Sequence, residues 1–322
     1  MPGTPMSRTR SNLLLLLVAL IWGSAFVAQA LGMQGVGPLT FTALRFALGA
    51  AVIAPWTWRE WRALQARGQA PGRRDLAQVG GLGLLLFLGA VMQQVGMLST
   101  SVTNAGFLTA LYVPLVPVLA WLMFRQAPHW SVWPAAFGCV AGTWLLAGVG
   151  SSTAAPGAMG TPAGGAWLGL NVGDLWVIGS SLPWALHVLL VGRIAHRMQG
   201  PLVVATGQFL ICSALSLVAG LATEPWSLHG LNLALGAIVY TGVLSVGVGF
   251  TLQVIGQRHA RPADSAIVLS SETVFAAIFG ALFMGDRIDR AGLLGCALIL
   301  ACGLLVQLQP LWRAWRSAAA PR

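Results

Sequence analysis

Apolar residues fill long stretches of this chain, and short groups of charged, glycine or proline residues separate the stretches. Ten stretches are close to the roughly 20 residues that an α-helix needs to cross a bilayer. The pattern therefore predicts an all-α membrane protein with ten transmembrane helices. These predicted helices cover residues 13–31, 38–56, 76–97, 102–124, 131–149, 173–193, 201–221, 232–254, 264–284 and 290–308.

The prolines support several of these boundaries. Pro38, Pro201 and Pro262 stand at or near predicted helix starts, where the missing N–H has no intrahelical partner to lose. Pro114 and Pro117 in the fourth stretch and Pro183 in the sixth each leave a carbonyl without its helical donor, so both stretches are expected to kink.

Composition identifies the solvent of these helices as lipid. The chain is 57% hydrophobic and 8% charged, whereas a soluble domain has about 25% charged residues. The net charge of +10 raises the question of a nucleic-acid partner. The arginines that carry this charge lie in short segments between apolar stretches and form no basic face, so no nucleic-acid partner is expected.

The cysteines predict neither disulfides nor a metal site. All four lie inside apolar stretches, and none has C-x-x-C spacing or a histidine at ligand distance. We interpret them as small packing residues and expect no cofactor. The four are Cys139, Cys212, Cys296 and Cys302.

The first apolar stretch also resembles a signal peptide, because Arg8 and Arg10 precede LLLLLVALIWG and AFVAQA resembles a cleavage site. We expect it to be retained, because it belongs to the internal repeat of the chain. That repeat is seen in GAVMQQVG (89–96) and GFTLQVIG (249–256), which share G-x-x-x-Q-x-x-G at an offset of 160 residues.

Other pairs recur at nearly the same offset, including Trp22 with Trp184 and Arg45 with Gln208. Five spans per copy is an odd number, so the second copy enters the membrane from the opposite side, as in transporters with inverted repeats. The predicted organisation is a cytoplasmic tail (1–12), a first five-helix repeat (13–149), an outer linker (150–172), a second five-helix repeat (173–308) and a cytoplasmic tail (309–322).

Arginine placement predicts the orientation. With the N-terminus in the cytoplasm, 15 arginines fall in inner segments, two fall in outer segments (Arg287 and Arg290) and Arg45 lies within a span. This asymmetry follows the positive-inside rule and places both termini in the cytoplasm, in a multi-pass protein of the inner membrane. The segment WTWREWRALQARG, with its tryptophans between arginines, is expected to lie at the inner interface. The inner arginines are Arg8, Arg10, Arg59, Arg62, Arg67, Arg73, Arg74, Arg125, Arg193, Arg197, Arg258, Arg261, Arg313, Arg316 and Arg322.

Four stretches resemble the EamA-type branch of the drug/metabolite transporter superfamily: ALIWGSAFVAQALG, GPLTFTALRFALGA, TNAGFLTALYVPLVPVLA and SSETVFAAIFGALFMGDRI. The resemblance covers nearly the whole chain, with one departure at Gln126, where an acidic residue is usual. It implies ten helices around a central cavity, lined by helices 1, 3, 4, 6, 8 and 9, with helices 5 and 10 to one side. It also implies export or exchange of small metabolites, often amino acids.

Glu272 is the main candidate for chemistry, because it lies about 12 Å below the inner interface at 1.5 Å per residue. A charge at that depth is costly unless it is paired, hydrated or protonated. One hypothesis is that Glu272 binds a substrate ammonium or carries a proton during transport. The other is that it is a structural carboxyl, either hydrogen-bonded to backbone that a kink has freed or protonated and without a role in transport.

Arg45 lies about one and a half turns into the second predicted helix from its outer end. It either fixes the helices near the outer face as a snorkelling or capping side chain, or holds a substrate carboxylate, or forms an ion pair inside the protein. The resemblance does not place helix 2 among the main cavity helices, which favours the structural role.

Further polar and aromatic residues are candidate cavity-lining or substrate-binding groups. Gln93 and Gln253 occupy the same repeat position and are expected to face inward, either as cavity lining or as hydrogen bonds between helices. A histidine inside a span is more often a satisfied interior group than a proton relay. The remaining candidates are Trp22, Trp184, Tyr112, His187 and Asn104.

These observations predict a secondary transporter that is not an enzyme and moves small polar metabolites, amino acids or related compounds, by alternating access around a central cavity. Its partners are a small-molecule substrate and the bilayer, and the choice between monomer and homodimer stays open. The alternatives are an intramembrane enzyme acting on a lipid-linked substrate and a channel. The sequence shows neither a catalytic constellation nor a filter loop or ring of like groups for them.

Overall fold

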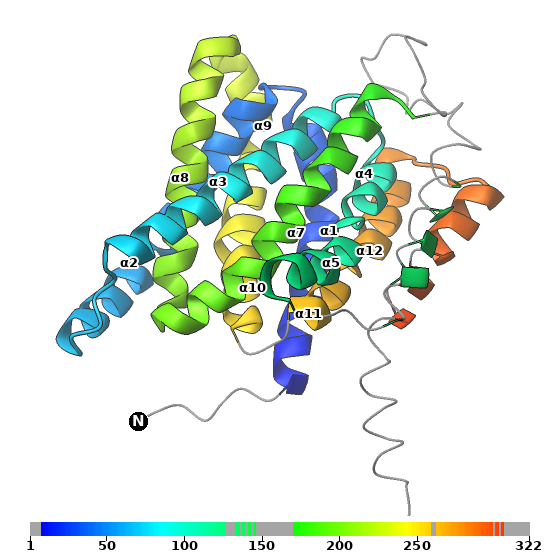
Figure 1. The fold of residues 1–322 in the computed structure, drawn as a ribbon. Coiled ribbons are helices and arrows are strands. Elements are labelled where there is room, and N and C mark those ends of the chain that lie inside the picture. Colours follow the sequence, from blue (N-terminus) through cyan, green and yellow to red (C-terminus); the bar gives the residue numbers. More distant parts are fainter. Residues whose placement is uncertain are drawn as a thin grey trace, which may run out of the picture.

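The computed structural model describes residues 8–125, 170–258 and 262–302 apart from 299, with scattered positions between 130 and 145 and residues 304 and 305. The elements assigned within these residues are all helical, and η denotes a π-helix (Figure 1). They are α1 (Arg8–Gly32), α2 (Pro38–Ala66), α3 (Arg73–Gly96), α4 (Val102–Thr109), α5 (Tyr112–Phe124), α7 (Val172–Met198), α8 (Pro201–Thr223), α9 (Leu228–Tyr240), η1 (Thr241–Phe250), α10 (Thr251–Gln257), α11 (Pro262–Leu269), α12 (Glu272–Phe279) and η2 (Gly280–Met284).

Seven helical segments in the described residues are long and apolar enough to cross a membrane. They correspond to the first, second, third, fourth, sixth, seventh and eighth predicted spans, so the prediction of an all-α membrane protein is confirmed. The ninth predicted span consists of shorter helices, and a further short apolar helix begins at Arg290. Most of the fifth predicted span, most of the outer linker, most of the first tail and all of the second tail lie outside the described residues.

The outward surface of the helices suits a lipid solvent. Large apolar side chains stand exposed along several helices, among them Leu122 (66% exposed), Val218 (70%) and Leu282 (70%). In water, such a surface would be unfavourable by about 25 cal/mol per Å² of apolar area. In a bilayer it contacts hydrocarbon, and only the interior of the bundle needs to satisfy polar groups.

The second helix is longer than its predicted span of 38–56. It continues through Pro55 to Ala66, so WTWREWRALQA is part of α2 rather than a separate segment. The Arg62 guanidinium carbon lies 4.2 Å from the Trp58 ring centre in this extension. Hydropathy marks where a helix leaves the hydrocarbon but carries no signal for where the helix itself ends.

Two predicted spans, the fourth and the ninth, are each interrupted by a break, and the two breaks are 160 residues apart in the sequence. The fourth ends as α4 at Thr109 and resumes as α5 at Tyr112. The reason is Pro114, which has no N–H to donate to the Ala110 carbonyl and whose ring crowds that carbonyl. The break realises the expected kink, whereas α5 runs through Pro117 and α7 runs through Pro183 without interruption.

The second break was not predicted. α11 ends at Leu269 and α12 starts at Glu272 without any proline between them. The Ser270 carbonyl accepts from both the backbone N–H of Thr273 and its hydroxyl (2.9 Å for the hydroxyl), so a local turn competes with the helix. Glu272 therefore begins a half-helix and does not sit in the middle of a continuous span.

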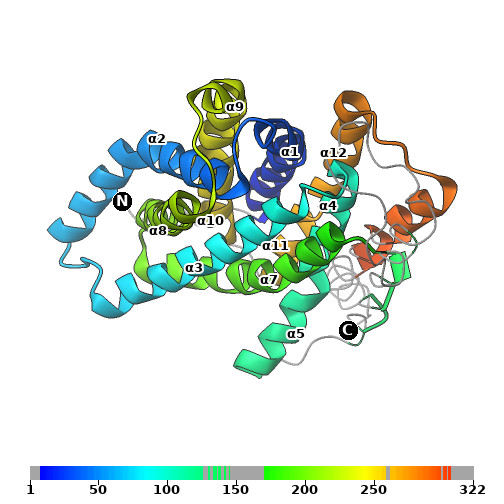
Figure 2. The same ribbon diagram turned by 90° about the horizontal axis from the view of Figure 1, so that it is seen from above.

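The helices close into a ring around the centre of the molecule. Each helix of the ring packs against the next one, in the order α1, α12, α4, α7, α3, α8, α2, η1 and back to α1. Figure 2 looks down this arrangement, with the blue and cyan N-terminal helices interleaved with the green and yellow ones. Helices from the two halves of the chain thus alternate all the way around this ring.

Two carboxylates connect α2 and α8 at opposite ends. Glu60, late in α2, accepts the N–H of Val203 at the start of α8 (2.8 Å). Glu224, just after α8, accepts the N–H groups of Leu39 and Thr40 at the start of α2 (2.8 Å each). The first N–H groups of a helix have no intrahelical acceptor and carry partial positive charge, so each carboxylate satisfies the helix that it meets.

Candidate functional site

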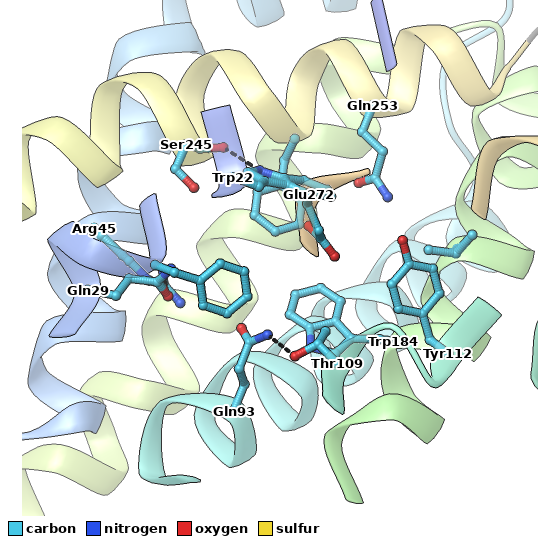
Figure 3. Close-up of a pocket in the computed structure, with 13 residues that line it drawn as sticks. Trp22, Gln29, Arg45, Gln93, Thr109, Tyr112, Trp184, Ser245, Gln253 and Glu272 are labelled. Atoms are coloured by element: carbon cyan, nitrogen blue, oxygen red, sulfur yellow. Dashed lines mark hydrogen bonds between the residues drawn. The ribbon is translucent and has the colours of Figure 1, made fainter. Parts of the chain in front are cut away.

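A cavity lies inside the ring of helices and is drawn in Figure 3. It contains about 520 Å³ of space between side chains, including open space at its mouth. Its lining residues come from α1, α2, α3, α4, α5, α7, η1, α10 and α12. They are Trp22, Phe26, Gln29, Arg45, Gln93, Thr109, Tyr112, Trp184, Val188, Ser245, Phe250, Gln253 and Glu272.

Arg45 and Gln29 form one polar side of the cavity. Arg45 extends from α2, is 3% exposed, and donates from Nη1 to Oε1 of Gln29 on α1. Its guanidinium carbon lies 5.6 Å from the Phe41 ring centre and 5.2 Å from the Phe46 ring centre. Amide and aromatic contacts therefore fix the direction of the guanidinium.

Glu272, Gln253 and Tyr112 form the other polar side. Figure 3 shows their polar ends directed toward the same part of the cavity, away from Arg45. Glu272 is 4% exposed and Gln253 is fully buried. The Gln253 amide has no partner at either Nε2 or Oε1, and the Tyr112 hydroxyl donates to the Ala266 carbonyl at 3.3 Å. Among the described residues, no side chain is recorded as donating to the Glu272 carboxylate.

Aromatic rings separate the two polar sides. The Phe250 ring centre lies 4.6 Å from that of Trp22 and 6.0 Å from that of Trp184. Trp22 Nε1 donates to the Ser245 carbonyl at 3.2 Å, whereas Trp184 Nε1 is buried without a partner. The cavity thus has two polar sides with aromatic rings between them.

Glycines make room for both tryptophans. A Cβ at Gly89 would lie 3.0 Å from the Trp184 ring, and a Cβ at Gly249 would lie 2.8 Å from Trp22 Nε1. These glycines are the first residues of the two G-x-x-x-Q-x-x-G motifs. Each motif therefore packs against the tryptophan of the opposite half of the chain.

The two glutamines of the motif differ in their bonding. Gln93 is 6% exposed and donates from Nε2 to the Thr109 hydroxyl at 2.8 Å, so it both lines the cavity and links α3 to α4. The Thr109 hydroxyl in turn donates to the Ala105 carbonyl at 2.7 Å. Gln253 makes no such bond, and its amide remains available to a ligand. Both of the interpretations left open from the sequence therefore apply to Gln93.

Seven of the candidate residues lie on the cavity and two do not. Those on it are Trp22, Arg45, Gln93, Tyr112, Trp184, Gln253 and Glu272.

His187 is fully buried next to Trp184, and its Nε2 is 2.8 Å from Gln208 Oε1, so it packs outside the lining. Asn104 lies in the first turn of α4, where its N–H bonds to the Ser101 hydroxyl at 3.1 Å. Neither residue is among those that line the cavity.

Arg45 corrects the expected set of cavity helices. The lining includes helices 1, 3, 4, 6, 8 and 9 of the sequence analysis, as expected, and also the second helix through Arg45. An arginine near a helix end can reach either the interface or the interior, and sequence position does not distinguish these directions. The bond to Gln29 turns Arg45 inward.

Several lining residues were not among the candidates. Gln29 could have been identified from the sequence, because an amide inside an apolar helix needs a hydrogen-bond partner in the protein interior. The others carry no distinguishing pattern in an apolar sequence. They are Phe26, Thr109, Val188, Ser245 and Phe250.

A family model described as the EamA-like transporter family matches this chain twice, over residues 9–148 and over residues 171–307. The chain is 25% identical over 305 residues to an uncharacterized transporter of Archaeoglobus fulgidus, covering 94% of this chain and 88% of the relative. It is 27% identical over 306 residues to the uncharacterized transporter YwfM of Bacillus subtilis, covering 92% of each.

The threonine/homoserine exporter RhtA of Escherichia coli (strain K12) is 25% identical over 298 residues, covering 91% of this chain and 89% of RhtA. A solved crystal structure is similar with a TM-score of 0.66 at 21% identity, covering 94% of this chain and 99% of that chain. At this identity the likeness to the crystal structure shows a common fold.

Proposed function

This chain belongs to the EamA-like transporter family, and on that premise we propose that it moves amino acids or related small polar metabolites across the inner membrane by export or exchange. It is a membrane transporter and not an enzyme. The observation that carries the proposal is the central cavity, to which both halves of the chain contribute polar side chains and one tryptophan each. A small polar molecule would find both hydrogen-bonding groups and aromatic surface there.

The proposed architecture is ten transmembrane helices in two inverted five-helix repeats. The two matches of the family model support it, and so do the helix bounds. α4 covers 102–109 and α11 covers 262–269, while α5 starts at Tyr112 and α12 at Glu272, each at an offset of 160. The first residue after each break, Tyr112 or Glu272, lines the cavity.

The contacts between the halves support an inverted relation. Glu60 meets the start of α8 and Glu224 meets the start of α2, so the same contact occurs twice with the two halves exchanged. In the same way, Trp22 of the first half packs against Gly249 of the second, and Trp184 of the second half packs against Gly89 of the first. We propose that the two halves rock about the cavity and expose it to each side in turn.

The proposed orientation leaves both termini in the cytoplasm and makes a direct prediction. A reporter fused after Ala70 is expected to give a cytoplasmic signal, and one fused after Gly157 a periplasmic signal, because arginines concentrate on the cytoplasmic side. Paired alkaline phosphatase and green fluorescent protein fusions measure this. The reversed pair of signals contradicts the proposed orientation.

The name of RhtA suggests which substrates to test first. We expect purified protein in proteoliposomes to exchange external radiolabelled L-threonine, L-homoserine or another L-amino acid for the same compound trapped inside. Flux should saturate and be accelerated by the trapped compound, since a carrier returns faster when loaded. Non-saturable flux that ignores the trapped compound supports a channel instead, and absence of flux for all amino acids overturns the proposed substrates.

A further inference from the structure

We propose that Arg45 binds the carboxylate of the transported molecule and that Glu272 binds its ammonium group, so that the cavity selects zwitterions over simple organic cations. The inference rests on the proposed function, because it concerns the substrate of the same cavity. It assigns Arg45, on a helix not expected to line the cavity, the role of an anion-binding residue.

The first argument is that Arg45 is a buried cation without an anion. Its side chain is 3% exposed, and its Nε atom is buried without a hydrogen-bond partner. In the described part of the chain, a salt bridge joins Arg197 to Asp75, and none is formed by Arg45. A buried charge is costly without a partner, and a ligand carboxylate arriving through the cavity would supply one.

The second argument is that Arg45 is already oriented. Gln29 holds Nη1, and the rings of Phe41 and Phe46 lie against the guanidinium. A snorkelling arginine would instead extend toward the membrane surface. Since a guanidinium carries five N–H donors in one plane, most remain for a carboxylate, whose two oxygens match that geometry.

The third argument is the opposite side of the cavity. Glu272 supplies a carboxyl group there, and the unpartnered Gln253 amide supplies both a donor and an acceptor. Figure 3 shows Arg45 and Glu272 on separate sides of the cavity, with aromatic rings between them. Among the described residues no salt bridge joins Arg45 to Glu272, whereas a zwitterion spanning the cavity would partner both. A simple cation would satisfy Glu272 and leave Arg45 unpaired, which disfavours it.

The test compares ligands that differ at one charged group. The probes are the proteinogenic L-amino acids and L-homoserine, and then the α-carboxamide and the N-acetyl derivative of the tightest binder. Calorimetric titration of the purified full chain measures Kd. The carboxamide keeps the ammonium and removes the anion, so we expect it to bind wild type at least about tenfold more weakly, the typical loss of a hydrogen bond to a charged group.

The variant Arg45→Gln identifies the residue responsible. In it we expect the amino acid and its carboxamide to bind equally, because the guanidinium that distinguishes them is absent. Arg62→Gln is the matched control: it removes an arginine from the same helix that also contacts an aromatic ring but lies outside the cavity. It should retain the wild-type preference. Arg45→Lys keeps the charge without the planar donors and is expected to retain part of the preference. It replaces Arg45→Gln in the test if that variant fails to fold.

Equal binding of the amino acid and its carboxamide by wild type overturns the proposal, as does an undiminished preference in Arg45→Gln. Failure of all amino acids to bind wild type also overturns it. Flux measurements distinguish failure of this proposal from failure of the proposed transport function. If wild type and Arg45→Gln transport the amino acid and the carboxamide equally, the transport function stands and the role of Arg45 falls. If the binding preference holds but no probe crosses the membrane, the carboxylate site stands and the transport proposal falls.

Discussion

Replacing Glu272 by glutamine is expected to leave the protein folded and to reduce amino-acid flux at least about tenfold. Glutamine keeps the shape of the side chain but offers no anion to an ammonium group, and charge-assisted hydrogen bonds contribute about 1.5–3 kcal/mol. It also cannot take up or release a proton, so any pH dependence of flux that arises from Glu272 should disappear. Proteoliposome uptake over a range of pH, with Tm measured on the same preparation, tests both points.

Glu272→Ala should also lose flux, and its comparison with Glu272→Gln separates charge from packing. The matched control is Glu224→Gln, which changes a glutamate that caps α2 away from the cavity. We expect this control to keep the wild-type pH profile, with at most a lower Tm. Wild-type flux and an unchanged pH profile in Glu272→Gln remove Glu272 from the mechanism and leave it as a structural carboxyl.

Replacing Gly23 by leucine is expected to disrupt the site through packing. A Cβ at Gly23 would lie 2.8 Å from the Glu272 carbonyl oxygen and 2.9 Å from the Ala276 backbone nitrogen. These are backbone atoms, so α1 and α12 must move apart. Overpacking typically costs about 1–3 kcal/mol, and the shift separates Trp22 from the helix that carries Glu272. We therefore expect both a lower Tm and a loss of flux.

The control for this prediction is Gly236→Leu on α9, where a Cβ would meet no atom within 4 Å. This position faces outward, and leucine there contacts lipid, so Tm and flux should stay close to those of wild type. If Gly23→Leu behaves like Gly236→Leu, the close contact between α1 and α12 does not position the site.

Much of the fold follows from local properties of the sequence. Hydropathy is a sum over single residues, so it located the seven long helices that the structure describes without knowledge of their partners. Pro114 acts on the carbonyl four residues before it, which made the break between α4 and α5 predictable. The break before Glu272 was not, because it depends on competition among serine and threonine hydrogen bonds that helices usually tolerate.

The candidate site was harder to predict than the fold. A soluble helix shows its interior face by its polar residues, but a transmembrane helix is apolar on both the lipid side and the protein side. Rare polar residues were therefore the available markers, and Glu272, Gln93 and Gln253 were found by them. The same reasoning selected His187, which the structure places outside the lining next to Gln208.

The sequence by itself determined that the chain is a helical membrane protein with an internal repeat pattern, because length, hydropathy and motif spacing are properties of the chain alone. Tertiary structure alone decided which polar groups share one cavity. Whether Arg45 turns outward or toward Gln29, and whether Trp22 and Trp184 meet glycines of the opposite half, depends on how helices rotate and cross. Those rotations are set by contacts between different helices, which no local pattern encodes.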